Sequence, residues 1–192
     1  MKEHHVFPWW AGYLLINPLR KISLNPEEIL KNYIDRGMKI IDAGCAMGFF
    51  SLPMAKLAGH EGKVICIDPQ KQMLNALKRR AAKAGLSRSI EARLCTFDSL
   101  MIGDLSGQID LAFAFAVLHE TRDEKKFISE ISSTLKSGSI FIFGEPHVVS
   151  WKEFDSSLAL IKESGFIVEQ IIQKRNNNIA VMRKNGNLTN YK

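Results

Sequence analysis

The residues best suited to bind a ligand lie in the stretch 38–48, which reads MKIIDAGCAMG. Asp42 ends a short β-branched run, and three small residues follow it at every second position: Gly44, Ala46 and Gly48. Small residues let a backbone turn tightly and pass close to a bound molecule. A helical apolar pattern follows over residues 49–57, so the turn leads into a helix N-terminus with unpaired N–H groups. We therefore expect a ligand site at this turn.

A second carboxylate, Asp68, indicates the kind of ligand. It ends the apolar run 63–68 (KVICID) and lies about 20 residues after the turn, the spacing at which an acid reaches a ribose hydroxyl pair in dinucleotide-binding folds. The G-x-G-x-x-G spacing of that fingerprint is absent, because here an acid opens the motif and the small residues alternate. The pattern favours a ribose-bearing ligand bound without the dinucleotide motif.

The elements that position these residues alternate along the chain. Apolar runs and period-two patterns predict strands at residues 39–42, 63–68, 89–95, 109–115, 139–143, 166–172 and 178–183. Amphipathic patterns and capping residues predict helices at residues 25–35, 49–57, 69–84, 123–135 and 152–164. Strands separated by helices, with a hairpin-like pair at the end, predict a three-layer, doubly wound α/β sandwich with a mostly parallel, seven-stranded sheet.

The length of 192 residues and a hydrophobic content of 46% predict a single domain with one sizeable core. We expect an aromatic N-terminal arm over residues 1–25, a core over residues 26–184 and a loose tail over residues 185–192. Residues 1–5 lack the pattern of a signal peptide, and no apolar run is long enough to span a membrane. We therefore expect a cytoplasmic protein without a membrane span.

Three cysteines, Cys45, Cys66 and Cys95, fall near separate predicted strand ends, without a C-x-x-C pair or a histidine cluster around them. In a chain without a secretion signal, this distribution indicates reduced thiols. We expect no bound metal.

The net charge of +6 and the pI near 9.3 suit an anionic partner such as RNA or an acidic membrane surface. The basic residues are nevertheless scattered over the whole chain. Their densest cluster, residues 78–83, lies on one predicted helix, which favours a solvated helix face over nucleic-acid binding.

The stretch 42–48 resembles motif I of the class I S-adenosylmethionine (SAM) dependent methyltransferases, usually acid-x-Gly-x-Gly-x-Gly, with Ala46 in place of the middle glycine. Residues 109–120 (IDLAFAFAVLHE) resemble the family's strand-four motif F-D-x-V-x-x-x-x-V-L-H-H. Residues 135–138 (LKSG) resemble its L-k-P-G-G turn, and residues 164–166 (SGF) its a-G-F entry to the last two strands. The motifs are most similar in form to those of the small-molecule "type 11"-like branch, which resembles the ubiquinone and menaquinone biosynthesis methyltransferases. The resemblance implies a sheet of order 3-2-1-4-5-7-6 with strand 7 antiparallel.

The resemblance also implies SAM as the cofactor and S-adenosylhomocysteine (SAH) as its product. Asp42 is expected to hold the methionine amino group, often through water, and Asp68 to accept both ribose hydroxyls. The family's adenine-contacting acid falls at Thr96 in this sequence, with Asp98 as a displaced alternative. For the apolar positions, ordinary core packing is the alternative to cofactor contact. The expected cofactor-binding residues are Asp42, Gly44, Cys45, Ala46, Met47, Gly48, Asp68, Pro69, Gln70, Thr96, Phe97, Asp98, Phe115 and Ala116.

The chemistry follows from this cofactor. The sulfonium already activates the methyl carbon, so the protein mainly aligns a nucleophile with the C–S bond and keeps water out. An acceptor that must lose a proton also needs a base. The candidates follow strand ends on the same rim of the sheet: His119, Glu145 and His147. Glu120 lies on that rim too, and a surface or supporting role is the alternative for the histidines.

The arm over residues 6–22 (VFPWWAGYLLINPLRKI) is rich in aromatic residues and is broken by two prolines. Three interpretations stay open: extra core packed on the sheet, a lid over the methyl donor, and an interfacial membrane contact. Because the loop after residue 145 is short, we predict that residues 6–19 fold over the pocket. The expected substrate-binding residues are Trp9, Trp10 and Tyr13 of this arm, with His119 and Glu120 of the rim.

Two absent motifs narrow the acceptor. The Asn/Asp-Pro-Pro-Tyr/Phe string used by family members that methylate planar exocyclic or amide nitrogens is missing after the fourth strand, and no cysteine pair is present to hold arsenic. We expect in-line methyl transfer to a small or lipid-like acceptor at the carboxyl edge of the sheet. An RNA methyltransferase and a non-catalytic SAM-binding module are the alternatives.

Overall fold

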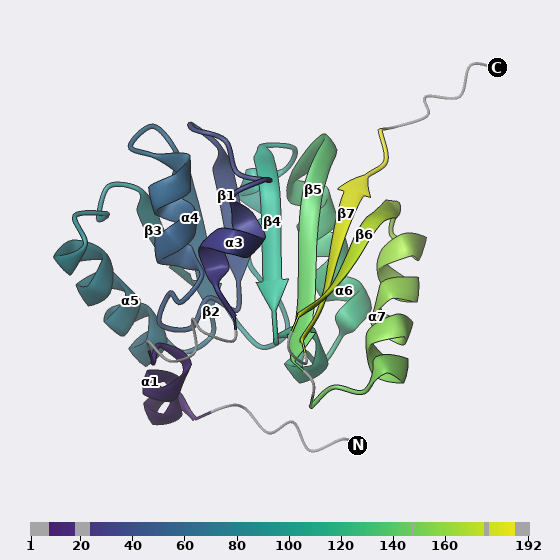
Figure 1. Ribbon diagram of the computed structural model, residues 1–192, viewed down its shortest axis with the longest axis horizontal. Coiled ribbons are helices and arrows are strands. Elements are labelled where there is room, and N and C mark those ends of the chain that lie inside the picture. The colour runs from purple at the N-terminus through teal and green to yellow at the C-terminus, as the bar shows by residue number, and fades with distance from the viewer. Residues whose placement is uncertain (1–7, 18–23, 147, 175–176, 187–192) are drawn as a thin grey trace.

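The computed structural model describes residues 8–17, 24–146, 148–174 and 177–186 of the chain. Seven strands form one twisted sheet with helices on both faces (Figure 1). The strands are β1 Lys39–Ala43, β2 Lys63–Asp68, β3 Ile90–Leu94, β4 Ile109–Phe115, β5 Leu135–Pro146, β6 Phe166–Lys174 and β7 Asn177–Lys184. Two of them, β2 and β4, have the predicted bounds.

The strand order is β3-β2-β1-β4-β5-β7-β6. The first five strands pair in parallel, and β7 runs antiparallel to both of its neighbours, β5 and β6. This confirms the predicted doubly wound α/β fold and its order of strands. The parallel strands all end at one edge of the sheet, which is the lower edge in Figure 1.

Helices cover both faces of the sheet, and each face buries its own apolar cluster. The helices are α1 Gly12–Leu15, α3 Pro26–Leu30, α4 Ser51–Ala58, α5 Lys71–Lys83, α6 Glu124–Thr134 and α7 Trp151–Glu163, with short 3-10 turns at η1 Trp9–Ala11, η2 Gly103–Leu105 and η3 Leu118–Glu120. The core under α3, α4 and α5 is distinct from the core under α6 and α7. Along β4, Phe113 faces the first cluster and Ala112 the second, as expected for a strand buried on both faces.

Polar side chains fix where several helices begin. Asn25 accepts a hydrogen bond from the Glu27 N–H at the start of α3, and Asp123 accepts one from the Lys126 N–H at the start of α6. Ser150 and Glu153 form a reciprocal capping box at α7. These capping residues are visible in the sequence, so the helix starts could be predicted.

Two predicted elements differ from the structure by several residues. The helix expected over residues 25–35 ends at Leu30, because the Tyr33 N–H bonds to the carbonyl of Leu30, three residues back, and a turn follows. Strand β5 absorbs the turn expected at residues 135–138. Leu135 pairs with β4 before the register shifts, so the segment with Gly138 at φ 75° is a bulge within a longer strand.

No helix of the described ranges is long and apolar enough to cross a membrane. The division into arm, core and tail is not tested by the fold. Residues 187–192 of the expected tail lie outside the described part of the chain.

Candidate active site

The small residues after β1 are required by the backbone. Gly44 has φ 74° and Gly48 has φ 81°, a region that side chains disfavour. A Cβ at Gly44 would lie 2.7 Å from the Val117 side chain, and one at Gly48 would lie 2.3 Å from Leu77. Ala46, at φ 45°, adopts a left-handed conformation despite its methyl group. The turn therefore needs small residues for both conformation and space.

Asp68 at the end of β2 joins this turn to the next loop. Its carboxylate accepts a hydrogen bond from the Ala46 N–H at 2.9 Å and one from the Gln70 N–H at 2.8 Å. The side chain is buried, and burial raises the pKa of Asp68 to about 6, although the two backbone hydrogen bonds oppose the shift. Asp68 thus holds two loops together on the wall of a cavity.

Asp42 lies deeper than Asp68. The Ser51 hydroxyl donates a hydrogen bond of 2.5 Å to its carboxylate, which ties β1 to the first residue of α4. Burial raises the pKa of Asp42 to about 7; the Ser51 hydrogen bond opposes this shift, and the nearby Asp68 charge adds to it. Asp42 is not among the residues that line the cavity, so its expected contact with an amino group stays a prediction.

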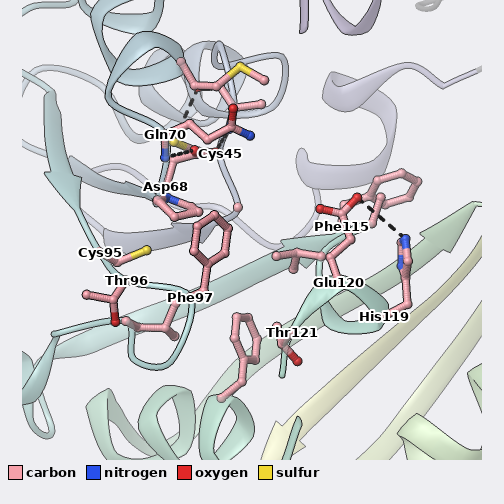
Figure 2. A pocket seen from close by; sticks show the side chains of 18 of the residues that line it. Cys45, Asp68, Gln70, Cys95, Thr96, Phe97, Phe115, His119, Glu120 and Thr121 are labelled. Carbon is pink, nitrogen blue, oxygen red and sulfur yellow. Dashed lines mark hydrogen bonds and ion pairs between the residues drawn. The ribbon is translucent and has the colours of Figure 1, made fainter. Parts of the chain in front are cut away.

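A cavity of about 440 Å³ opens at the carboxyl edge of the sheet, beside the turn after β1. Figure 2 shows Asp68 and Gln70 on one side of it and His119 and Glu120 on the other. The expected cofactor residues that line it are Gly44, Cys45, Ala46, Met47, Asp68, Pro69, Gln70, Thr96, Phe97, Asp98, Phe115 and Ala116. Gly48, like Asp42, lies outside this lining set. The fold thus gathers four separate sequence segments around one space.

The loop after β3 carries the two candidates for an adenine contact. Thr96 is engaged within the loop, because its hydroxyl accepts a hydrogen bond from the Asp98 N–H at 3.3 Å. The Asp98 carboxylate forms an ion pair with Arg122 at 3.3 Å. Neither arrangement tests which of the two meets the adenine, and both assignments stay predictions.

A further acid, Glu130 on α6, fixes the same loop. Its carboxylate accepts hydrogen bonds from the Ser99 hydroxyl at 2.7 Å and from the Leu100 N–H at 2.6 Å. This role of Glu130 was not predicted from the sequence. Glu130 lies about 30 residues along the chain from its partners, in the middle of an amphipathic helix, where the sequence pattern predicts an exposed glutamate.

Two of the predicted base candidates form a pair across the rim. Glu145 near the end of β5 is 1% exposed, and its carboxylate lies 2.7 Å from Nδ1 of His119 on the η3 turn. The backbone N–H of His119 also donates a hydrogen bond to the Glu145 carboxylate at 3.4 Å. The hydrogen bond to Glu145 raises the pKa of His119, while burial opposes the rise. The third candidate, His147, lies outside the described residues.

Glu120 follows His119 directly and lines the same cavity. Its carboxylate lies 3.9 Å from Nε2 of His119 (Figure 2). Burial raises the pKa of Glu120, and the charge of His119 opposes this shift. His119 is therefore flanked by carboxylates, a buried one at Nδ1 and a cavity-lining one near Nε2.

The described part of the arm reaches the same edge of the sheet. Helix α1 lies beside α5 (Figure 1), and a Cβ at Gly12 would lie 2.7 Å from the sulfur of Met73. Ile16 lines the cavity, whereas Trp9 and Trp10 do not and are 43% and 63% exposed. Residues 6, 7, 18 and 19 and the Tyr13 side chain lie outside the described part. Substrate binding by Trp9, Trp10 and Tyr13 thus stays a prediction.

The cavity suits a cationic nucleoside such as SAM. Several acids line it, and none of the described residues in its lining is a lysine or an arginine. The Gly44–Gly48 turn leaves space where side chains would otherwise project, and Asp68 places a carboxylate at the tip of β2. In the described ranges, no group of histidine, cysteine and acidic side chains is placed to hold a metal ion.

Comparison with known proteins decides the family. Residues 34–187 match the model of a methyltransferase domain, which is most of the chain. The chain belongs to this methyltransferase family. Its membership confirms the predicted SAM-dependent methyltransferase and SAM as the cofactor that the family uses.

Two curated relatives of this methyltransferase have different acceptors in their names. A ubiquinone biosynthesis O-methyltransferase from Methylocella silvestris is 30% identical over 60% of this chain and 48% of its own length. A ribosomal protein L11 methyltransferase from Syntrophomonas wolfei is 30% identical over 76% of this chain and 44% of its own. This chain thus spans about half the length of either relative, and their acceptors differ.

A solved structure supports the fold of the methyltransferase. The crystal structure of a SAM dependent methyltransferase from Aquifex aeolicus superposes with a TM-score of 0.82 and covers 93% of this chain and 99% of that one. Its sequence identity of 21% makes this a similarity of fold.

Proposed function

We propose that this protein transfers the methyl group of SAM to a small or lipid-like acceptor that binds in the cavity at the carboxyl edge of the sheet. One observation carries the proposal: His119, paired with the buried Glu145, lines the same cavity as the turn after β1 and Asp68. This arrangement supports a site in which the methyl donor and the acceptor meet beside a base. The three cysteines are buried and unpaired, as expected for reduced thiols, which supports a cytoplasmic location.

The residues that hold SAM in this proposal are those of the turn, together with Asp68 and the loop after β3. Asp68 accepts the ribose hydroxyls with the lone pairs that its two backbone hydrogen bonds leave free. The loop after β3, fixed by Glu130, closes the side toward the adenine. When bound, SAM supplies an electrophilic methyl group on a sulfonium.

His119 acts as the base. Its Nδ1–H donates to the buried Glu145, which leaves the Nε2 lone pair free to take a proton from the acceptor. Glu145 also stabilises the imidazolium that forms, in the way that a third group orients and supports a catalytic histidine. The apolar walls of the cavity keep water from the reacting atoms.

Two measurements test the proposal. Calorimetry should show binding of SAM and SAH, and an extract incubated with the protein and isotope-labelled SAM should yield a small molecule heavier by one labelled methyl group. Label found only in RNA would favour the RNA methyltransferase instead. Binding of SAM with no transfer to any molecule would favour the non-catalytic SAM-binding module, and no binding of SAM or SAH at millimolar concentration would refute the proposal.

A further inference from the structure

The charge of the cavity lining differs from that of the whole chain. The chain carries 26 lysines and arginines against 20 acids. The described residues of the lining nevertheless include no lysine or arginine, and their acids are Asp68, Asp98, Glu120, Asp123 and Glu130. The cavity is therefore suited to positively charged or neutral molecules.

Four of these acids have structural partners. Asp68 and Asp123 each accept backbone hydrogen bonds, Asp123 as the cap of α6. Glu130 holds the loop after β3, as described above. Asp98 forms its ion pair with Arg122. Their charges serve mainly to shape the site.

Glu120 is different. Its carboxylate lies 3.9 Å from Nε2 of His119, beyond the range of a normal hydrogen bond. Among the described residues, none donates a hydrogen bond to its carboxylate. Its oxygens are thus available at the same place where Nε2 of His119 is available as a base.

Apolar side chains line much of the same cavity. Phe115, Phe127 and Val148 lie in its lining, and Ile16 contributes from the arm. An acceptor that fills the space therefore needs an apolar body with one hydrogen-donating head directed at Glu120 and His119.

We propose, on the basis of the proposed function above, that the acceptor is an aliphatic amine with an apolar body, whose nitrogen is held between Glu120 and His119. The ammonium form pairs with the Glu120 carboxylate, which compensates its charge beside the sulfonium. A carboxylate or phosphate at this place would face the Glu120 carboxylate, and no lysine or arginine among the described lining residues is there to compensate it, so anionic acceptors are disfavoured.

The reaction balances with these groups alone. The ammonium passes one proton to Nε2 of His119 and becomes a neutral amine with a lone pair. That lone pair forms the new N–C bond to the methyl carbon while the S–C bond breaks and its electron pair stays on sulfur. The positive charge moves from the sulfonium to the methylated nitrogen, and no further reactant is needed.

An aliphatic nitrogen also agrees with the sequence around η3. The Asn/Asp-Pro-Pro-Tyr/Phe string, which suits planar exocyclic and amide nitrogens, is absent there. An aliphatic amine has a localised lone pair once it is deprotonated, so it needs a base and a counter-charge rather than a planar clamp. Glu120 and His119 are those two groups.

Three probes that share a ring and differ in the head group test the proposal: benzylamine, benzyl alcohol and benzoate. Their binding is measured by calorimetry on the full chain saturated with SAH, and methyl transfer to each is measured by mass spectrometry with SAM. We expect benzylamine to bind roughly tenfold more tightly than benzyl alcohol, benzoate not to bind, and benzylamine alone to be methylated.

In the Glu120→Gln variant, the ratio of benzylamine affinity to benzyl alcohol affinity should fall roughly tenfold, while Glu120→Asp should keep the ratio. Glu61→Gln is the matched control, since it removes a charge from an exposed residue in the turn between α4 and β2, at the opposite edge of the sheet. A protein that binds SAH but none of the probes, or that binds the alcohol or benzoate at least as tightly as the amine, would overturn the amine proposal. An unchanged preference in Glu120→Gln would overturn it as well. Failure to bind SAH would instead count against the proposed function.

Discussion

The two sides of the cavity are built in different ways. On the side of the turn after β1, the backbone forms the wall: glycines adopt positive φ, and the Asp68 carboxylate accepts hydrogen bonds from N–H groups of two loops. On the side of η3, side chains form the wall, and the His119 ring is held by the Glu145 carboxylate of strand β5. A binding surface made of backbone is fixed by the fold, whereas one made of side chains can change its chemistry by single substitutions. We infer that the cofactor side is the constant part of the site and the η3 side sets the acceptor.

The largest effect should come from the η3 side. The His119→Gln variant removes the base, and methyl transfer should fall on the order of 10²–10⁴-fold. The affinity for SAH, measured by calorimetry, should stay within about twofold, because the turn and Asp68 are untouched. Equal loss of both quantities would show that the two sides of the cavity are not independent.

A substitution on the cofactor side should have the opposite pattern. Asp68→Ala removes a carboxylate that bonds two backbone N–H groups and faces the cavity. SAM binding should weaken roughly 10- to 150-fold, the value of one charge-assisted hydrogen bond. Asp104→Asn serves as the control: this exposed acid on the η2 turn pairs with Arg93 outside the cavity lining, so its loss should leave SAM affinity unchanged. A folded Asp68→Ala protein with unchanged affinity would show that the ribose is elsewhere.

The arm should affect transfer more than cofactor binding. Removal of residues 1–19 takes away Ile16, which lines the cavity, and uncovers Met73. We expect the truncated protein to keep SAM affinity within a few-fold and to lose methyl transfer at least about tenfold, because water reaches the reacting atoms and the acceptor is less well held. A shorter protein that keeps full turnover, with only a lower melting temperature, would show that the arm is core packing.

The pH dependence of transfer should report the His119–Glu145 pair. Glu145 raises the pKa of His119 above its ordinary 6.5, and the base works only when unprotonated. The rate of the parent protein should therefore rise with pH through a value above 6.5. In Glu145→Gln, which keeps the shape of the side chain but removes the charge, this rise should move to lower pH. A rise that stays in place would assign the titration to another group.

The smallest effect should come from Ala46, where the backbone is strained. Glycine tolerates φ 45° better than alanine does, so Ala46→Gly should stabilise the protein by about 1 kcal/mol and raise the melting temperature by about 2–4 °C. Ala84→Gly is the control, because Ala84 has φ −89° and gains nothing from the exchange. A lower melting temperature for Ala46→Gly than for the parent would contradict the strain at this position.

The sequence by itself determined the sheet, the glycine-rich turn after β1 and the place of Asp68 at the end of β2. Strands such as β2 and β4 are short continuous apolar runs, and the turn needs small residues at fixed positions, so both leave a local pattern. Asp68 could be located because its distance along the chain follows from one βαβ unit. These features depend on neighbours in sequence, and a single chain displays them directly.

The tertiary structure decided the rest. It placed Glu145 against His119 and Glu130 against Ser99, pairs separated by 26 and 31 residues, and it left Glu120 without such a partner among the described residues. It also brought Ile16 to the cavity while Trp9 and Trp10 stay outside the lining. The physical reason is that a carboxylate in a sequence shows neither its depth nor its partner. Only the packing of strands and helices decides whether such a group holds a loop, orients a histidine or faces a ligand.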